Sequence, residues 1–286
     1  MTIGSWTSLA GILAVAGFTA VLASPQSQGG PPAAPATPQI QLAPGLREVP
    51  DYRKLVVEPP AVKPPDGFTS IFNGKDLSGW HVSTTARHGV QPDFHVAHGI
   101  ILGTQRPLGS GGLLLTDRKY RDFELYMEVK PDWGCDSGIF FRTTESGAAY
   151  QITMDYLPGG SMGRFIGEGG IQFGAGRGAA PGGGRAAAAA APPAPPPSAS
   201  QSNDAGMKVW KRDDWNAVRV RIEGEVPHAT VWINDVQVSD ATDTENHALN
   251  GMVEGPIAIQ IHGGGARWQP GGFWRWRNIG IRELRK

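Results

Sequence analysis

The chain has 286 residues, with 26 Lys and Arg against 26 Asp and Glu, so its formal charge at pH 7 is zero. Nucleic-acid-binding proteins usually carry a basic excess or a basic stripe, so composition argues against a nucleic-acid partner. The 40 glycines and 24 prolines exceed what a compact domain usually contains, which indicates low-complexity segments beside a shorter folded part. The single cysteine, Cys135, cannot form an intramolecular disulfide and is expected to be a small buried apolar residue.

The first 23 residues have the pattern of a signal peptide. Leu9–Ala23 is uncharged and apolar, and it ends in small residues before Ser24. It is shorter than the ~20 residues that cross a bilayer comfortably. Met1–Ser8 contains no basic side chain, whereas a signal peptide usually begins with a positively charged region. The sequence therefore predicts an exported protein, periplasmic or extracellular, with no stable membrane insertion after cleavage. An uncleaved membrane anchor and a buried helix are the alternatives.

Two further segments are predicted to lie outside the core. Residues 24–65 are rich in proline and poor in aromatic residues, which is typical of a disordered or polyproline-like tether. Residues 174–206 include Ala186–Ala191 and Pro195–Pro197 and interrupt a region that looks strand-like on both sides. We interpret this second segment as a long surface-loop insertion in a domain that spans residues 66–286.

The remaining sequence is typical of an all-β domain. Apolar and polar residues alternate in Phe123–Lys130 and in Ala217–Glu223, as expected for strands with one face on a core. His228–Ile233 and Val236–Val238 flank Asn234-Asp235, which predicts a tight hairpin. Further strands are expected at Gly138–Thr143, Tyr150–Met154, Ile257–His262 and Ile279–Leu284. Many short strands without long helical periodicity predict a sandwich of two antiparallel sheets or a jelly roll.

Five motifs follow one another along the predicted domain. The opening motif is Phe68–Trp80 (FTSIFNGKDLSGW). The later ones are Asp122–Leu125, Ser137–Arg142, Trp215-Asn216, and Ile259–Gly263 with Arg277–Ile279 close behind. These motifs and their order resemble those of the 3-keto-disaccharide hydrolase family, and the resemblance covers residues 66–286 apart from the insertion. It implies a concanavalin A-like jelly roll and cleavage of 3-keto-glycosides by lyase and hydratase steps, with an oligosaccharide or glycoside as the partner.

The sequence departs from the pattern of this family at two positions. Gln151 stands in the strand Tyr150–Asp155 near the place where the family often has an acidic residue. The usual Gln-Asp-His near the end is here Gln260-Ile261-His262, which retains the histidine and has an apolar residue in place of the acid. The identity of any catalytic base at the first position is therefore open.

Cleavage of a 3-keto-glycoside by elimination needs a base for the C2 hydrogen, a stabiliser of the enolate and an acid for the leaving oxygen. Strand alternation puts Gln260 and His262 on one face. The same rule groups Gln151 with Asp155, and Arg142 ends a neighbouring strand. We therefore predict a shared pocket. The predicted catalytic residues are His262, Asp155 and Arg142, and the predicted substrate-binding residues are Gln151, Gln260, Glu168 and Trp274.

Each of these side chains also has a structural interpretation. Arg142 could pair with Asp155 only to hold the strand, and His262 could be an exposed histidine at a loop edge. Glu168 lies in a glycine-rich turn that could leave it in water, and Asp136 beside Ser137-Gly138 is typical of turn chemistry. The aromatic cluster near the C-terminal motif could stack on a sugar or pack in the core, and core packing is the commoner use. Its members are Trp268, Phe273, Trp274 and Trp276.

No histidines show the spacing of a structural zinc site. His95 and His98 are close in sequence but would point to opposite faces of a strand. A single divalent ion held by Asp155 and His262 together with substrate oxygens would polarise the ketone, and it is the one cofactor that we consider. Two other functions compete with the enzyme: a non-catalytic, lectin-like carbohydrate-binding module and a structural or partner-binding sandwich.

Overall fold

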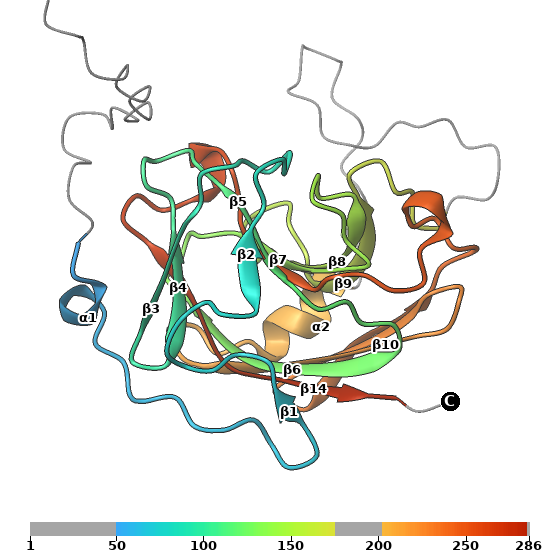
Figure 1. Ribbon diagram of the computed structural model, residues 1–286, viewed down its shortest axis with the longest axis horizontal. Helices are drawn as coiled ribbons and strands as arrows, with labels where there is room; N and C mark the ends of the chain where they lie inside the picture. Colours follow the sequence, from blue (N-terminus) through green and yellow to red (C-terminus); the bar gives the residue numbers. More distant parts are fainter. Residues whose placement is uncertain (1–49, 175–201, 285–286) are drawn as a thin grey trace, which may run out of the picture. The chain divides into compact units, whose positions relative to one another are not determined.

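Two antiparallel sheets pack face to face in the computed structural model, which describes residues 50–174 and 202–284 (Figure 1). This arrangement confirms the prediction of an all-β sandwich. The predicted signal peptide, residues 24–49 of the predicted tether and residues 175–201 of the predicted insertion lie outside the described residues. Within the described part of the chain, no helix is both long and apolar enough to cross a membrane.

The larger sheet has eight strands in the order β12-β11-β10-β6-β14-β4-β3, with β1 paired to β14. Its long central strands, β6 and β14, pair over most of their length. The strands are β1 (Thr69–Ser70), β3 (Asp93–Ala97), β4 (Ile100–Thr104), β6 (Phe123–Pro131), β10 (Asn216–Glu223), β11 (His228–Ile233), β12 (Val236–Thr242) and β14 (Phe273–Glu283).

The smaller sheet has six strands in the order β2-β5-β13-β7-β8-β9. The strands are β2 (Trp80–Val82), β5 (Gly112–Thr116), β7 (Ser137–Phe141), β8 (Ala149–Met154), β9 (Met162–Glu168) and β13 (Ala258–Ile261). The described residues also form four short helices: α1 (Tyr52–Leu55), which precedes β1, and α2 (Ser202–Val209), η1 (Leu249–Gly251) and η2 (Gly265–Arg267), which lie between strands, the last two being 3₁₀ helices.

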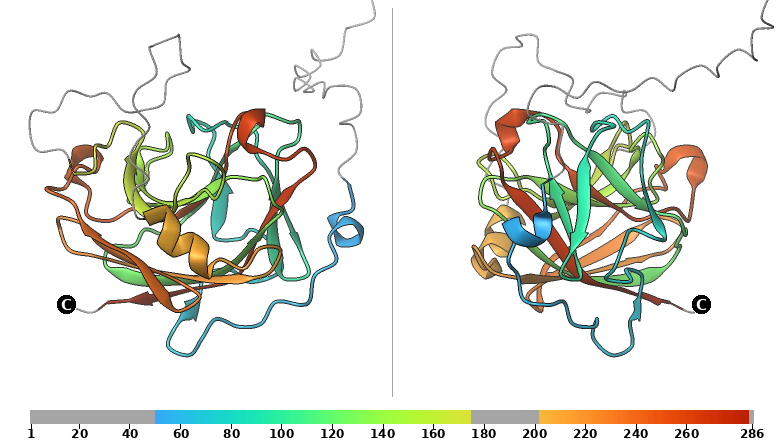
Figure 2. Two further views of the ribbon diagram at one scale, coloured as in Figure 1. Left: turned by 180° about the vertical axis from the view of Figure 1, so that it is seen from behind. Right: turned by 60° about the vertical axis from the view of Figure 1, so that its left-hand side comes forward.

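The two sheets lie one above the other (Figure 2), and the side chains of the main core lie between them. The larger sheet supplies Leu125, Met127 and Val129, which are fully buried and alternate with partly exposed residues as the sequence predicts. The smaller sheet supplies Ile139 and Ile259 among others. A second, smaller apolar cluster lies on the face of the smaller sheet that points away from the larger one. We call this face the outer face of the six-stranded sheet.

The predicted strands are all present, and the Asn234-Asp235 hairpin turn is confirmed because both residues have positive φ angles. Five strands of three or more residues were not predicted: β2, β3, β4, β5 and β9. In β4 and β5 every residue is buried, since both faces of these strands are covered. Such strands lack the apolar and polar alternation on which the prediction depends.

Residues 50–65, the last part of the predicted tether, pack against the domain, so the prediction of a disordered tether is wrong for them. Tyr52 and Val56 are buried against β3 and β4, and the Tyr52 hydroxyl donates a hydrogen bond of 2.5 Å to Asp93. The carboxylate of Glu58 lies 3.2 Å from both Lys130 and Arg275. We call residues 50–65 the N-terminal strap. Its few apolar and charged residues have specific partners despite the surrounding prolines.

Candidate active site

Three ionisable side chains lie side by side at one end of the six-stranded sheet. Asp136 directly precedes β7, Asp155 directly follows β8 and His262 directly follows β13. The register pairs Gly138 with Thr153, so two residues further on Asp136 comes beside Asp155. β13 is the neighbour of β7 on the other side, and His262 Nε2 lies 3.6 Å from Asp136 Oδ2. Alternate residues of a strand point to the same face. Each of these three residues is an even number of positions from an outward-facing residue of its own strand, so all three side chains lie on the outer face.

Arg267, from the η2 turn after β13, connects the two aspartates. Its Nε donates a hydrogen bond of 3.0 Å to Asp136 Oδ2, and its Nη2 contacts Asp155 Oδ1. A backbone hydrogen bond also connects the two residues, since the Asp136 amide donates to the Arg267 carbonyl. The arginine therefore supplies one fixed positive charge between two carboxyl groups, at a place where Asp136 is only 5% exposed.

Burial raises the pKa of Asp136 from 3.8 to about 7, and the nearby charge of Asp155 adds to this rise. The hydrogen bond and the charge of Arg267 oppose the rise without cancelling it. A carboxyl group with this pKa is present in both its protonated and its ionised form near neutral pH. It can therefore donate or accept a proton there, which an ordinary aspartate cannot do efficiently.

Three hydrogen-bonded polar side chains, those of His88, Gln260 and Gln151, lie on the same outer face. Gln260 Nε2 lies 3.0 Å from His88 Nδ1, and the amide of Gln151 lies 3.5 Å from Gln260 Oε1. Gly138 makes this contact possible, because a Cβ atom at that position would come within 2.0 Å of Gln151 Nε2. The predicted grouping of Gln151, Gln260 and His262 on one face is therefore what the structure shows.

His88 comes from the loop that covers the β5 side of the outer face. It packs edge-on against Phe140, with 5.2 Å between ring centroids. Burial lowers the pKa of His88 from 6.5 to about 4, and a positive charge on His262 would lower it further. The imidazole of His88 is therefore neutral around pH 7, and it adds a hydrogen-bonding side chain without adding charge.

Glu168 and Arg142 do not belong to the cluster formed by Asp136, Asp155 and His262. Glu168 pairs with Ala149 at the far end of β8, on the same outer face. Arg142 follows the opposite end of β7 from Asp136, and a strand rise of about 3.3 Å per residue separates their backbones by roughly 20 Å. Its guanidinium is buried and donates to the carbonyls of Gly224 and Glu225 in the β10–β11 turn. Arg142 also does not pair with Asp155.

The position of Trp274 corrects the prediction that it contacts substrate. Its side chain is fully buried in the core between the sheets, stacked on Trp276 with 5.7 Å between ring centroids. The indole N–H donates 2.8 Å to the Cys135 carbonyl. Trp268 and Trp276 are buried as well. Cys135 is buried as expected, and burial raises the pKa of its thiol to about 12.

Asp155 and His262, which we expected to hold a divalent ion, do not lie on neighbouring strands. Asp155 and His262 lie on either side of Asp136, two strand spacings apart, and Arg267 contacts the Asp155 carboxylate. Across the described residues, no cluster of three or more His, Cys, Asp or Glu side chains is arranged to hold a metal. The cation beside Asp155 in this structure is a guanidinium.

Three members of the site were not selected from the sequence. Asp136 looked like a turn residue because it precedes Ser137-Gly138. Its position next to a strand of the motif is the only feature that could have indicated a role in the site. His88 and Arg267 lie in loops with no local pattern, and they reach the site by long-range contacts with Gln260 and Asp136. No signal in a single sequence identifies such residues.

Comparisons with known proteins show to which family the chain is similar. A family model described as the 3-keto-alpha-glucoside-1,2-lyase-like domain matches residues 67–282. A Bacteroides thetaiotaomicron protein named 3-keto-disaccharide hydrolase is 35% identical over 85 residues, which is 28% of this chain and 29% of that protein. The matched part thus spans less than a third of the length of that relative.

Solved structures with a similar fold include two proteins with low sequence identity. One is a proposed glycosyl hydrolase from Parabacteroides distasonis, with 15% identity and a TM-score of 0.46 over 76% of this chain and 99% of that one. The other is the carbohydrate-binding module CBM66 from Bacillus subtilis, with 11% identity and a TM-score of 0.42 over 72% of this chain and 96% of that one. Because the family model covers most of the chain, the protein belongs to the 3-keto-alpha-glucoside-1,2-lyase-like domain family of carbohydrate-active proteins.

Proposed function

We propose that this protein cleaves 3-keto-glycosides by removing the C2 proton and eliminating the group at C1, followed by hydration of the product. The observation that carries the proposal is the pair formed by His262 and Asp136, 3.6 Å apart, with Arg267 fixed beside it. The family match supports the substrate class. The apolar segment Leu9–Ala23 supports an exported protein, periplasmic or extracellular, in which this reaction takes place.

In the proposed mechanism, His262 accepts the proton from C2, which the C3 ketone makes acidic. The electron pair of the C–H bond forms an enolate, and Arg267 is the fixed cation that can stabilise its oxygen. The C1–O bond then breaks, and the electron pair of the enolate forms the C1–C2 double bond. Protonated Asp136 gives its proton to the leaving oxygen, since its pKa of about 7 keeps part of it protonated at neutral pH.

Hydration completes the sequence. Water adds its hydroxyl group to C1 and a proton returns to C2, so that the net products are the free 3-keto sugar and the released aglycone. The same two side chains then carry protons in the opposite direction, as reversal of acid and base roles requires. Gln260 and Gln151 offer amide donors and acceptors that can orient the sugar hydroxyls.

Paired substitutions test this assignment. We expect His262→Gln and Asp136→Asn each to lower turnover of a 3-keto-glucoside by about 10²–10⁴-fold, because each removes a proton-transfer group. The matched controls are His228→Gln and Asp240→Asn on the other sheet, where the same two residue types lie 3.4 Å apart and the aspartate is exposed. The measurement is release of aglycone together with the 2-hydroxy-glycal intermediate.

A chelator arm separates this mechanism from one that uses a divalent ion. We expect turnover to be unchanged by chelator, since Arg267 supplies the positive charge in the proposed site. Loss of turnover on chelation would mean that a metal ion, and not Arg267, stabilises the enolate. If the wild-type protein binds 3-keto-glucosides but forms no product, the enzyme proposal fails and the lectin-like alternative takes its place. If the His262 and Asp136 variants turn over normally, the protein is an enzyme but the assignment of these two residues is wrong.

A further inference from the structure

We propose that the outward face of the eight-stranded sheet carries a second saccharide-binding site, which takes a neutral polysaccharide chain. This face lies on the opposite side of the sandwich from the candidate active site. The proposal does not rest on the proposed catalytic function.

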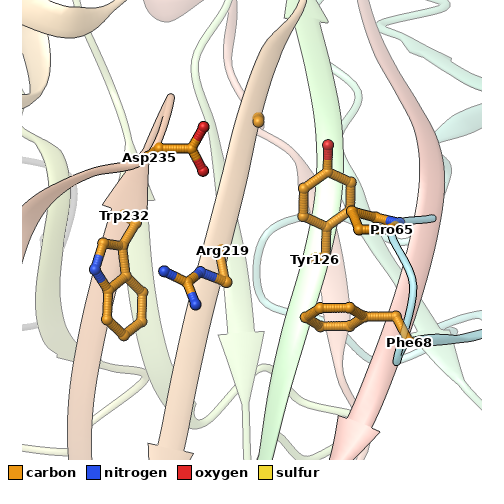
Figure 3. A pocket seen from close by; sticks show the side chains of 7 residues that line it. Pro65, Phe68, Tyr126, Arg219, Trp232 and Asp235 are labelled. Atoms are coloured by element: carbon orange, nitrogen blue, oxygen red, sulfur yellow. The ribbon is translucent and has the colours of Figure 1, made fainter.

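The site is built on a row of flat side chains that crosses three neighbouring strands. The register pairs Trp232 of β11 with Arg219 of β10, and Arg219 with Tyr126 of β6. The Arg219 guanidinium lies 4.0 Å from the centre of the Trp232 ring. Figure 3 shows Trp232 and Tyr126 on the two sides of Arg219. We call Trp232, Arg219 and Tyr126, together with Phe68, the aromatic row.

The N-terminal strap and the residues after it form one wall of this site. Phe68 contacts Tyr126, with 5.8 Å between ring centroids, and Pro65 lies next to the same ring (Figure 3). The strap can lie this close to the sheet because β14 has Gly280 beneath it. A Cβ atom at Gly280 would come within 2.7 Å of Pro64 and 3.0 Å of Phe68.

A pocket of about 270 Å³ lies over the row. Ala217, two residues before Arg219 on the same face, is small and leaves the floor open between the aromatic side chains. Asp235, an exposed residue in the β11–β12 turn, closes one end of the pocket. The volume is close to the lower end for ligand pockets, roughly 300 Å³, and suits a single sugar ring of a chain that continues over the surface.

The chemistry of the lining selects the ligand class. Flat rings of Trp232 and Tyr126 offer apolar surfaces of the kind that stack on a sugar face, and Tyr126 also carries a hydroxyl. Arg219 has donors and Asp235 has acceptors for sugar hydroxyls. Two carboxylates lie near Arg219 and offset its positive charge: Glu124, 3.6 Å away and shared with Arg282, and Asp235, which lines the same pocket. This balance favours a neutral saccharide over an anionic polymer.

The tryptophans themselves point to a binding role for this face. Five of the tryptophans in the described part of the chain are at most 9% exposed and pack in the core: Trp80, Trp210, Trp268, Trp274 and Trp276. Trp232 is only half-buried, as Trp133 and Trp215 are, and of these three it is the one that lines the pocket beside the strap. Cross-strand packing alone would also stabilise the sheet, so the test must measure binding as well as stability.

The probes are three soluble neutral polysaccharides, a β-glucan, an α-glucan and a galactomannan, tested with the full chain by affinity gel electrophoresis and tryptophan fluorescence. We expect binding to at least one of them, with a Kd that rises ten-fold or more in Trp232→Ala. The matched control is Trp215→Ala, because Trp215 is also half-buried, has a guanidinium 3.9 Å away and lies outside the pocket.

A second variant guards against misfolding. Asp235→Asn retains a residue that tolerates the positive φ of 66° at this turn and removes the charged acceptor, so we expect it to weaken binding at unchanged stability. His262→Gln is expected to bind the polysaccharide normally, and Trp232→Ala to turn over a small 3-keto-glucoside normally, which separates this proposal from the catalytic one. Absence of binding to all three probes, or equal binding by the wild type, Trp232→Ala and Asp235→Asn, would overturn the proposal.

Discussion

Asp136 combines burial, a neighbouring carboxylate and a bound arginine in one side chain. Burial and the charge of Asp155 favour its neutral form, while Arg267 favours its ionised form. Because the first two effects prevail, the folded protein holds a proton on Asp136 at pH values where the unfolded chain has lost it. The raised pKa is therefore also a statement about stability.

We expect the free energy of unfolding of the wild type to fall relative to that of Asp136→Asn as pH rises from 4 to 7. In this window the folded state binds more protons than the unfolded state, since the pKa is 3.8 unfolded and about 7 folded. The change is on the order of 2–4 kcal/mol, at about 1.4 kcal/mol for each pKa unit. Urea unfolding at pH 4.5, 6 and 7.5 measures it, with Asp240→Asn as the exposed control. A difference between wild type and Asp136→Asn that does not vary with pH would contradict the assigned pKa.

At the scale of elements, the N-terminal strap is part of the folded domain. Tyr52 and Val56 bury apolar surface on the outer side of β3 and β4, and Glu58 pairs with two basic side chains from β6 and β14. The strap also leads into the wall of the pocket near Phe68. A proline-rich composition therefore does not exclude specific packing when a few residues have buried partners.

A protein that starts at residue 66 should be less stable than one that starts at residue 50, by at least about 3 kcal/mol. Burial of one Val side chain and one Tyr side chain alone accounts for roughly this amount. Urea unfolding of the two forms at the same pH measures the difference. Equal free energies of unfolding would mean that the strap contributes no net stability.

The same scale shows which strands could be predicted. Strands with one exposed face, such as β6 and β10, alternate in polarity and were predicted within one or two residues. β4 and β5 were missed because the strap covers one and the loop near His88 covers the other, which leaves no polar face. This covering comes from distant parts of the chain, so the local sequence contains no record of it.

At the scale of the whole molecule, Arg142 links the two sheets. It follows a strand of the smaller sheet, and its guanidinium binds two carbonyls in the β10–β11 turn of the larger one. Only 2% of this side chain is exposed, and its burial lowers its pKa. A buried cation with backbone partners is suited to joining the sheets, and it lies far from the proposed proton-transfer pair.

We expect Arg142→Met to lower the free energy of unfolding by about 2–4 kcal/mol, because a buried cation and its two hydrogen bonds to the β10–β11 turn are lost. Turnover for each folded molecule should stay within about two-fold of the wild type, since Arg142 does not reach His262 or Asp136. Thermal unfolding and turnover measured below the transition separate the two effects. Lost turnover at unchanged stability would return Arg142 to the catalytic group, as its motif first suggested.

The all-β class, the family and the grouping of Gln151, Gln260 and His262 on one face could be predicted from the sequence. These follow from ordered motifs and from a period of two, which act along one strand and need no knowledge of its neighbours. The tertiary structure alone decided that Asp136 and Arg267 join His262, that Arg142 and Trp274 do not, and that Trp232 lines an outward pocket. The reason is physical: pairing across strands and the covering of a face depend on register and on residues far apart in the chain, which local alternation does not encode.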